Sequence, residues 1–215
     1  MKKAHLFILA AITLLVTGCD VAGIRGNGHT ATEQRTIGEF SEIRADGAFE
    51  IEWHSGAPAL SITTDENLLR YIENKISGNT LRLHARERVW PRHKIKVVVS
   101  SAALRGADLS GACRLNAKQI SGEKFFLRSS GATHINLAGN VDELIADMSG
   151  ATRLSAEALQ TKTAELSGSG ASRLDVTVSE ALRVSISGAG KVTYSGNPKT
   201  LEKHISGAGS IRQRN

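Results

Sequence analysis

The sequence lacks a strong excess of charge of either sign, and it lacks the motifs of the common enzyme classes. Its 27 basic and 21 acidic residues give a formal net charge of +6, too small on its own to indicate a nucleic-acid partner. There is no Gly-x-Ser-x-Gly elbow, no phosphate-binding Walker loop and no His-Glu-x-x-His zinc motif. The histidines are scattered without metal-ligand spacing, so we expect neither a metal site nor a cofactor.

Long apolar runs are also scarce, and cysteine is limited to Cys19 and Cys113. The first apolar run, Leu6 to Val16, follows Lys2 and Lys3 and is too short to span a bilayer as a helix, which is typical of a secretory signal. It ends in Leu-Val-Thr-Gly-Cys19, which resembles the lipobox of bacterial lipoproteins. The resemblance implies cleavage before Cys19 and acylation of its thiol, which leaves no partner for an internal disulfide. The alternative is an ordinary secretory signal with a chance cysteine.

These features predict three segments. Residues 1–18 form a lipoprotein signal peptide, residues 19–36 contain the lipidated cysteine and a flexible tether, and residues 37–215 form the folded domain. The tether is predicted because this stretch is rich in Gly, Thr and Asn and has no apolar period. The mature protein is therefore expected in the bacterial cell envelope, anchored to a membrane and facing the periplasm or the exterior.

The folded domain contains an internal repeat. The tripeptide Ser-Gly-Ala occurs six times at steps of 20, 19, 20, 18 and 19 residues. The repeat serines are Ser110, Ser130, Ser149, Ser169, Ser187 and Ser206. The residue five places after each serine is always Leu, Ile or Val, and apolar and polar residues alternate in between, which indicates strands. The pattern predicts an all-β fold, a right-handed parallel β-helix (single-stranded β-solenoid) with about 19–20 residues per coil.

The repeat also reaches back toward the N-terminus. Asp46-Gly47-Ala48 matches Ser110-Gly111-Ala112 place for place. The residues between are less regular and include a predicted short helix with Asp65 at its N-cap. We therefore divide the solenoid into decorated N-terminal coils at 37–100, which cap the stack, and regular repeats at 101–215.

Several of these motifs, taken in order, resemble one known family. They are Phe40-Ser-Glu-Ile43, Gly47-Ala-Phe-Glu-Ile51, Asp65-Glu-Asn-Leu-Leu69, Gly78-Asn-Thr-Leu81, and Leu109-Ser-Gly-Ala112 with its copies. The sequence is similar to the auto-transporter adhesin head GIN domain family over about residues 37 to 211. The resemblance implies a β-helical envelope domain, often carried on lipoproteins. It suggests adhesion and supplies no catalytic residues.

Two basic features are candidate binding sites. Four places after each of the first five repeat serines lies a basic residue, so stacked coils would form a stripe that could bind a polyanion. The residues of this stripe are Arg114, His134, Arg153, Arg173 and Lys191. The second feature is a basic loop with one tryptophan, which suits an anionic sugar or a lipid headgroup. The residues of this loop are Arg86, Arg88, Trp90, Arg92 and Lys94. The alternative for both is a solvated surface, with Trp90 packed on the end of the solenoid.

The leading functional prediction is a non-catalytic binding, adhesion or structural module. Its expected partners are the membrane, through the lipid anchor, and an anionic envelope polysaccharide or another protein. An alternative is a carbohydrate-active enzyme acting on an anionic polysaccharide. For that alternative the column Asp108, Arg128 and Asp147 places two carboxylates two coils apart, which is wide for a retaining pair and near the upper end for an inverting pair. A third possibility is self-association through the C-terminal coil, Ile205 to Ile211.

Overall fold

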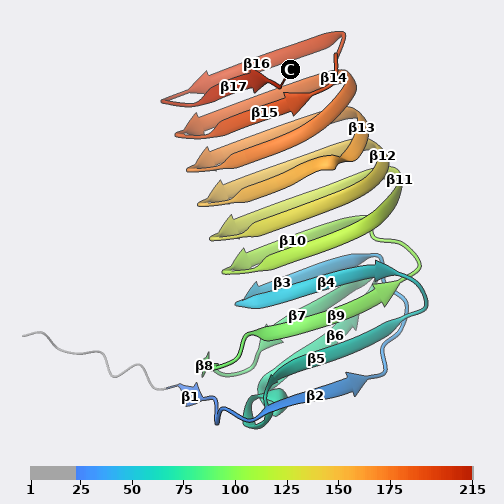
Figure 1. The fold of residues 1–215 in the computed structure, drawn as a ribbon, viewed down its shortest axis with the longest axis vertical. Helices are drawn as coiled ribbons and strands as arrows, with labels where there is room; N and C mark the ends of the chain where they lie inside the picture. Colours follow the sequence, from blue (N-terminus) through green and yellow to red (C-terminus); the bar gives the residue numbers. More distant parts are fainter. Residues whose placement is uncertain (1–22, 215) are drawn as a thin grey trace, which may run out of the picture.

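The computed structural model describes residues 23–214, and the predicted signal peptide and Cys19 lie outside this range. Most of the described chain is β-strand (Figure 1). The elements are β1 (Ile24–Arg25), β2 (Thr30–Arg35), β3 (Glu42–Gly47), β4 (Phe49–Ser55), β5 (Ala59–Asp65), η1 (Glu66–Tyr71), β6 (Ile72–Ser77), β7 (Thr80–Ala85), β8 (Val89–Trp90), β9 (Ile95–Ser101), β10 (Gly106–Gly111), β11 (Arg114–Gly131), β12 (His134–Gly150), β13 (Arg153–Gly170), β14 (Arg173–Gly188), β15 (Lys191–Ser195), β16 (Thr200–Ser206) and β17 (Ser210–Gln213). No helix within residues 23–214 is long and apolar enough to cross a membrane.

The regular coils are built from long parallel strands. Each of β11 to β14 is 16–18 residues long, runs along one face of the stack, bends, and returns along the other face (Figure 1). Neighbouring coils pair in parallel, and the register shifts at the bend, for example between Ala117 and Ile120. This confirms the predicted β-solenoid. Each of these coils is one long bent strand, because pairing continues around most of the bend.

The interior is filled by ladders of branched aliphatic side chains. The residues five places after the repeat serines are fully buried in the first five coils, as predicted: Leu115, Ile135, Leu154, Leu174 and Val192. Each such side chain contributes about 1.5–3 kcal/mol by leaving water. One hydrophobic cluster extends from Phe40 to Tyr194, so the N-terminal coils share a core with the regular repeats.

The Ser-Gly-Ala tripeptides form the tight turn between the two faces. Gly131 has φ +91°, and a Cβ there would lie 2.5 Å from the carbonyl oxygen of Gly111 in the coil before it. Only glycine permits both that backbone angle and that approach. The alanine that follows the glycine points outward, because Ala132 is exposed and the next residue, Thr133, is buried. The side chain after the alanine fills the narrow interior at the turn.

The decorated N-terminal coils continue both faces and then close them. Strand β3 pairs in parallel with β10, and β4 pairs in parallel with β11 and β9. The order then turns antiparallel, with β6 against β7, β5 against β9, and β2 against β5. These antiparallel strands cover the end of the core, as predicted for the N-terminal coils (Figure 1).

Two details of this region correct the sequence prediction. Residues 24–35 do not form a flexible tether, because β1 pairs with β8 and β2 pairs with β5. The short helix is present as a 3-10 turn, but the side chain of Asp65 makes no capping hydrogen bond. The carboxylate of Asp65 instead accepts hydrogen bonds from the backbone N–H groups of Gly28 (2.9 Å) and Arg92 (2.7 Å). The Asp65 carboxylate therefore fixes the N-terminal segment instead of capping the short helix.

Candidate anion-binding surface

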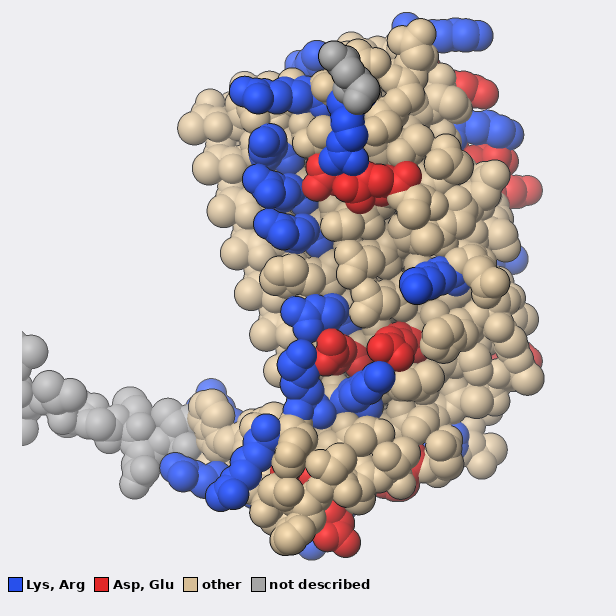
Figure 2. All heavy atoms as spheres, in the orientation of Figure 1, with Lys and Arg blue, Asp and Glu red and all other residues tan. Residues whose placement is uncertain are grey.

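The predicted basic stripe is assembled by the strand register. Arg114 pairs with His134, His134 with Arg153, Arg153 with Arg173, and Arg173 with Lys191. We call these five residues the basic column. They occupy successive hydrogen-bonded strands, so they follow one another at about 4.8 Å. Lys and Arg side chains form a vertical row near the left edge of the face shown in Figure 2.

An open groove of about 320 Å³ runs beside the basic column. The residues that line it come from four successive coils: His134, Ala151, Thr152, Arg153, Ala171, Ser172, Arg173, Ala189 and Lys191. Its alanines are the third residues of the Ser-Gly-Ala repeats, and they are exposed. Because their side chains are small, they leave room beside the cations. Thr152 Oγ1 and Ser172 Oγ, both buried, have no hydrogen-bond partner among the described residues.

The two ends of the basic column differ in charge compensation. Arg114 contacts Glu50 at 3.2 Å, and Lys94 contacts the same carboxylate at 3.2 Å. Burial raises the pKa of Glu50, but hydrogen bonds from Lys94 and Arg114 outweigh this effect and lower the pKa overall. The coil before the repeats therefore neutralises the first cation of the column.

The other end of the column is not neutralised in this way. Arg153, Arg173 and Lys191 have no carboxylate within 4.0 Å among residues 23–214. Asp175 follows Arg173 by two places, but it contacts Arg214 at 3.3 Å. Like charges on adjacent strands destabilise a sheet. A bound anion would offset the repulsion among these three neighbouring cations beside the open groove.

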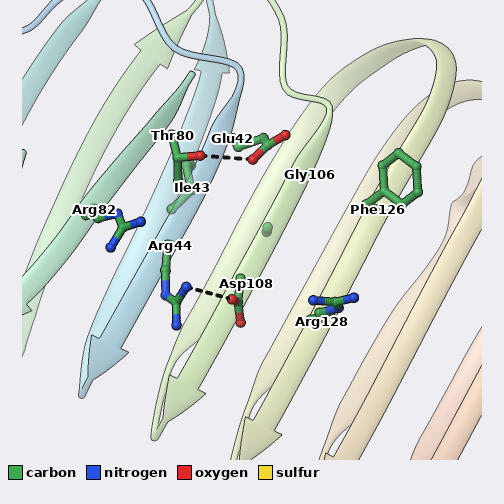
Figure 3. Close-up of a pocket in the computed structure, with 10 residues that line it drawn as sticks. Glu42, Ile43, Arg44, Thr80, Arg82, Gly106, Asp108, Phe126 and Arg128 are labelled. Carbon is green, nitrogen blue, oxygen red and sulfur yellow. Dashed lines mark hydrogen bonds and ion pairs between the residues drawn. The ribbon is translucent and has the colours of Figure 1, made fainter. Parts of the chain in front are cut away.

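A second charged surface lies on the opposite face, near β3, β10 and the returning half of β11. The register confirms that Asp108, Arg128 and Asp147 form one column. Arg44 joins it by contacting Asp108 at 3.7 Å (Figure 3). Arg82, on β7, extends it by one more strand. These two additional arginines were missed because the pairing of β3 with β7 leaves no periodic signal in the sequence.

The arrangement of this second surface is poorly suited to carboxylate chemistry. Its pocket of about 300 Å³ has three cations, Arg44, Arg82 and Arg128, and two carboxylates, Glu42 and Asp108, in its lining. Asp108 and Asp147 are separated by two strand steps, about 9.6 Å, with Arg128 between them. Within the described part of the chain, no group of three His, Cys, Asp or Glu residues is placed to hold a metal ion.

The predicted basic loop is divided by the fold. Arg86 donates to Glu73 at 2.6 Å, and Lys94 belongs to the cluster around Glu50. The middle of the segment stays on the surface. Arg88 and Arg92 are exposed, and half of the Trp90 surface is exposed. The loop is therefore not one continuous basic surface.

Cys113 is a buried structural residue. It follows the first repeat alanine and is 1% exposed. Burial raises the pKa of its thiol, which keeps the thiol protonated and unreactive.

Comparisons with known proteins agree with this architecture. The structure resembles a putative adhesin from Bacteroides fragilis, with a TM-score of 0.72, 19% identity, and coverage of 89% of this chain and 100% of the other. It also resembles a putative adhesin from Parabacteroides merdae (TM-score 0.55, 19% identity, coverage 90% and 99%). A third relative is a putative lipid binding protein from Parabacteroides distasonis (TM-score 0.53, 22% identity, coverage 90% and 100%). These likenesses show the fold.

The comparison with curated proteins gives no match. A sequence model described as "Putative auto-transporter adhesin, head GIN domain" matches residues 39–198. Because this match covers more than half of its length, the chain belongs to the auto-transporter adhesin head GIN domain family.

Proposed function

We propose that the protein is a lipid-anchored, non-catalytic binding module of the bacterial cell envelope that holds an anionic polysaccharide along the basic column. The observation that carries this proposal is the run Arg153, Arg173 and Lys191, stacked on adjacent strands beside a groove and without carboxylate partners in the described chain. A polymer with regularly placed negative charges can contact one cation per coil.

The family supports the binding role at a coarser level. Its description and those of the structural relatives name adhesins and, in one case, a lipid binding protein, and none names an enzyme. The proposed location in the envelope rests on the lipobox-like sequence that ends at Cys19. Acylation there is tested by the intact mass of the N-terminal peptide of the protein purified from membranes.

The groove is tested by equilibrium binding of the chain 20–215, which contains every described strand. We expect it to bind dextran sulfate and polygalacturonate and not neutral dextran, with affinity that weakens as salt screens the charges. The double variant Arg153→Ser/Arg173→Ser removes the two central cations. We expect it to bind at least tenfold more weakly, because each charge-assisted contact contributes about 1 kcal/mol or more.

A matched control is available on the opposite face. Arg82→Ser/Arg128→Ser removes the same charge from residues that also have no carboxylate within 4.0 Å in the described chain. If the groove holds the polymer, the control binds like the unmodified protein. Equal losses in both variants would show that only net charge matters. Release of shortened products from either anionic polymer would favour the enzyme instead.

A further inference from the structure

The first described residues lie against the exposed tryptophan. Strands β1 and β8 pair in parallel, with Ile24 opposite Val89 and Arg25 opposite Trp90. A Cβ built on Gly23 would clash with the indole nitrogen of Trp90, so the chain enters the fold against the edge of this ring. Both strands lie at the N-terminal end of the solenoid (Figure 1).

This end carries cations that are not neutralised by neighbouring carboxylates. Arg25, Arg88 and Arg92 are exposed, and none of their guanidinium groups has a carboxylate within 4.0 Å among residues 23–214. Lys and Arg side chains gather at the lower left of Figure 2, where the described chain begins. We call Arg25, Arg88, Trp90 and Arg92 the entry patch. An indole beside guanidinium groups is the composition of a surface that meets lipid headgroups.

The distance to the proposed anchor is short. Four residue steps separate Cys19 from Gly23, and they span at most about 14 Å when fully extended. The headgroup region of one leaflet is itself about 5–8 Å thick. An acyl chain on Cys19 therefore holds the entry patch within reach of the headgroups, and the antiparallel pairing of β2 with β5 excludes a long tether.

We propose that the entry patch is a membrane-docking surface that binds anionic phospholipid headgroups of the membrane in which Cys19 is anchored. Trp90 lies at the level of the headgroups, and Arg25, Arg88 and Arg92 contact their phosphates. The basic column then extends away from the bilayer and stays free for its own ligand. This inference rests on the part of the proposed function that places an acyl anchor on Cys19.

The experiment uses the chain 20–215 without the acyl group, so that the patch is measured apart from the anchor. All strands and the whole core lie within this range. The probes are vesicles of phosphatidylcholine with and without phosphatidylglycerol. We expect binding only to the anionic vesicles, and about fivefold weaker binding for each arginine removed, hence about 25-fold for Arg88→Ser/Arg92→Ser.

Tryptophan fluorescence locates the contact. The chain has two tryptophans, and Trp53 is buried in the core, so shallow brominated lipids in the vesicles quench Trp90 selectively. We expect this quenching to disappear in Trp90→Phe. The groove variant Arg153→Ser/Arg173→Ser is the control and should bind vesicles normally.

Each alternative outcome overturns the docking proposal. Equal binding to neutral vesicles, unchanged binding of the Arg88/Arg92 variant, or absence of Trp90 quenching would do so. So would loss of dextran sulfate binding in that variant with vesicle binding intact, since the entry patch would then be a sugar site. The proposed groove is tested by polysaccharide binding, and the acylation of Cys19 is tested by peptide mass. A negative result in either measurement does not change the interpretation of vesicle binding.

Discussion

The backbone of Gly131 shows how closely neighbouring coils approach at the turn. Its φ of +91° lies in the region that side chains disfavour, and the carbonyl oxygen of Gly111 occupies the space that a Cβ would need. Gly111, Gly150 and Gly170 have the same φ sign and the same approach to the coil before them. The repeat therefore keeps glycine for a reason that involves two coils at once.

We predict that Gly131→Ala loses about 2 kcal/mol or more of unfolding free energy, measured by urea denaturation. The left-handed backbone alone costs about 1–2 kcal/mol, and the clash with the carbonyl of Gly111 adds to it. Gly78→Ala, at φ +59° with no atom within 4 Å, measures the backbone cost without the clash. Gly38→Ala, with open space and no positive φ, should be close to neutral. Equal losses in Gly131→Ala and Gly38→Ala would contradict the packing described for the turn.

Sequence reasoning found the residues of the turn but not all of their directions. Glycine every 18–20 residues, followed by an aliphatic residue five places after each serine, predicts a bend and a buried ladder. The alternation of apolar and polar residues does not show which residue after the turn is the first to point inward. In the structure Ala132 is exposed and Thr133 is buried. This direction depends on the geometry of the turn, which the sequence pattern does not show.

At the scale of elements, the N-terminal segment is held by one buried carboxylate. Asp65 accepts from the backbone N–H groups of Gly28, Arg92 and His93, and it contacts His93 Nδ1 at 3.0 Å. Burial by itself raises the pKa of this carboxyl. The hydrogen bonds from His93, Arg92 and Gly28 outweigh burial and lower the pKa to about 2.

We predict that Asp65→Asn destabilises the protein and loosens β1 and β2. The amide replaces one acceptor oxygen by a donor that faces backbone N–H groups, at a cost of about 2 kcal/mol or more. Hydrogen exchange should show faster exchange in residues 24–35, with the regular coils protected as before. Exchange that rises uniformly across the molecule would contradict a local role for Asp65.

Because Asp65→Asn removes this carboxylate, the stability difference between the unmodified protein and the variant depends on pH. A folded-state pKa of about 2, below the ordinary value of 3.8, stabilises the protein fully above about pH 4. The contribution is lost as the pH falls from about 4 to about 2. The stability difference between the unmodified protein and Asp65→Asn should therefore shrink over this window, as measured by denaturation at several pH values.

The N-terminal strands show where prediction from sequence fails at this scale. The strands of the regular coils repeat, so each copy supports the interpretation of the next. Strands β1 and β2 have no such copies, and their composition is that of a linker. They form because β8 and β5, both distant in the sequence, supply partners for their backbone, and the Asp65 carboxylate accepts a hydrogen bond from Gly28 between the two strands.

At the scale of the whole molecule, the register converts a sequence period into a surface. The spacing of basic residues predicted a column, and the strand pairing confirms it from Arg114 to Lys191. The match of Asp46-Gly47-Ala48 to Ser110-Gly111-Ala112 also aligns Glu50 with Arg114, and the pairing of β4 with β11 confirms this alignment. The groove beside the column was not predictable, because it depends on the outward alanines of three coils, Ala151, Ala171 and Ala189. We propose different tasks for two parts of the solenoid, anchoring for its N-terminal end and ligand binding for the basic column.

The most direct test of this account is the affinity of the chain 20–215 for oligogalacturonates of increasing length. The side chains from His134 to Lys191 cover three strand steps, about 14 Å. We predict that affinity rises with length until the extended oligomer spans this distance and then levels off, and that Arg153→Ser/Arg173→Ser removes the rise. Equal affinity for the monosaccharide and the longest oligomer, or a rise that persists in the variant, would contradict the claim that the basic column is the binding site.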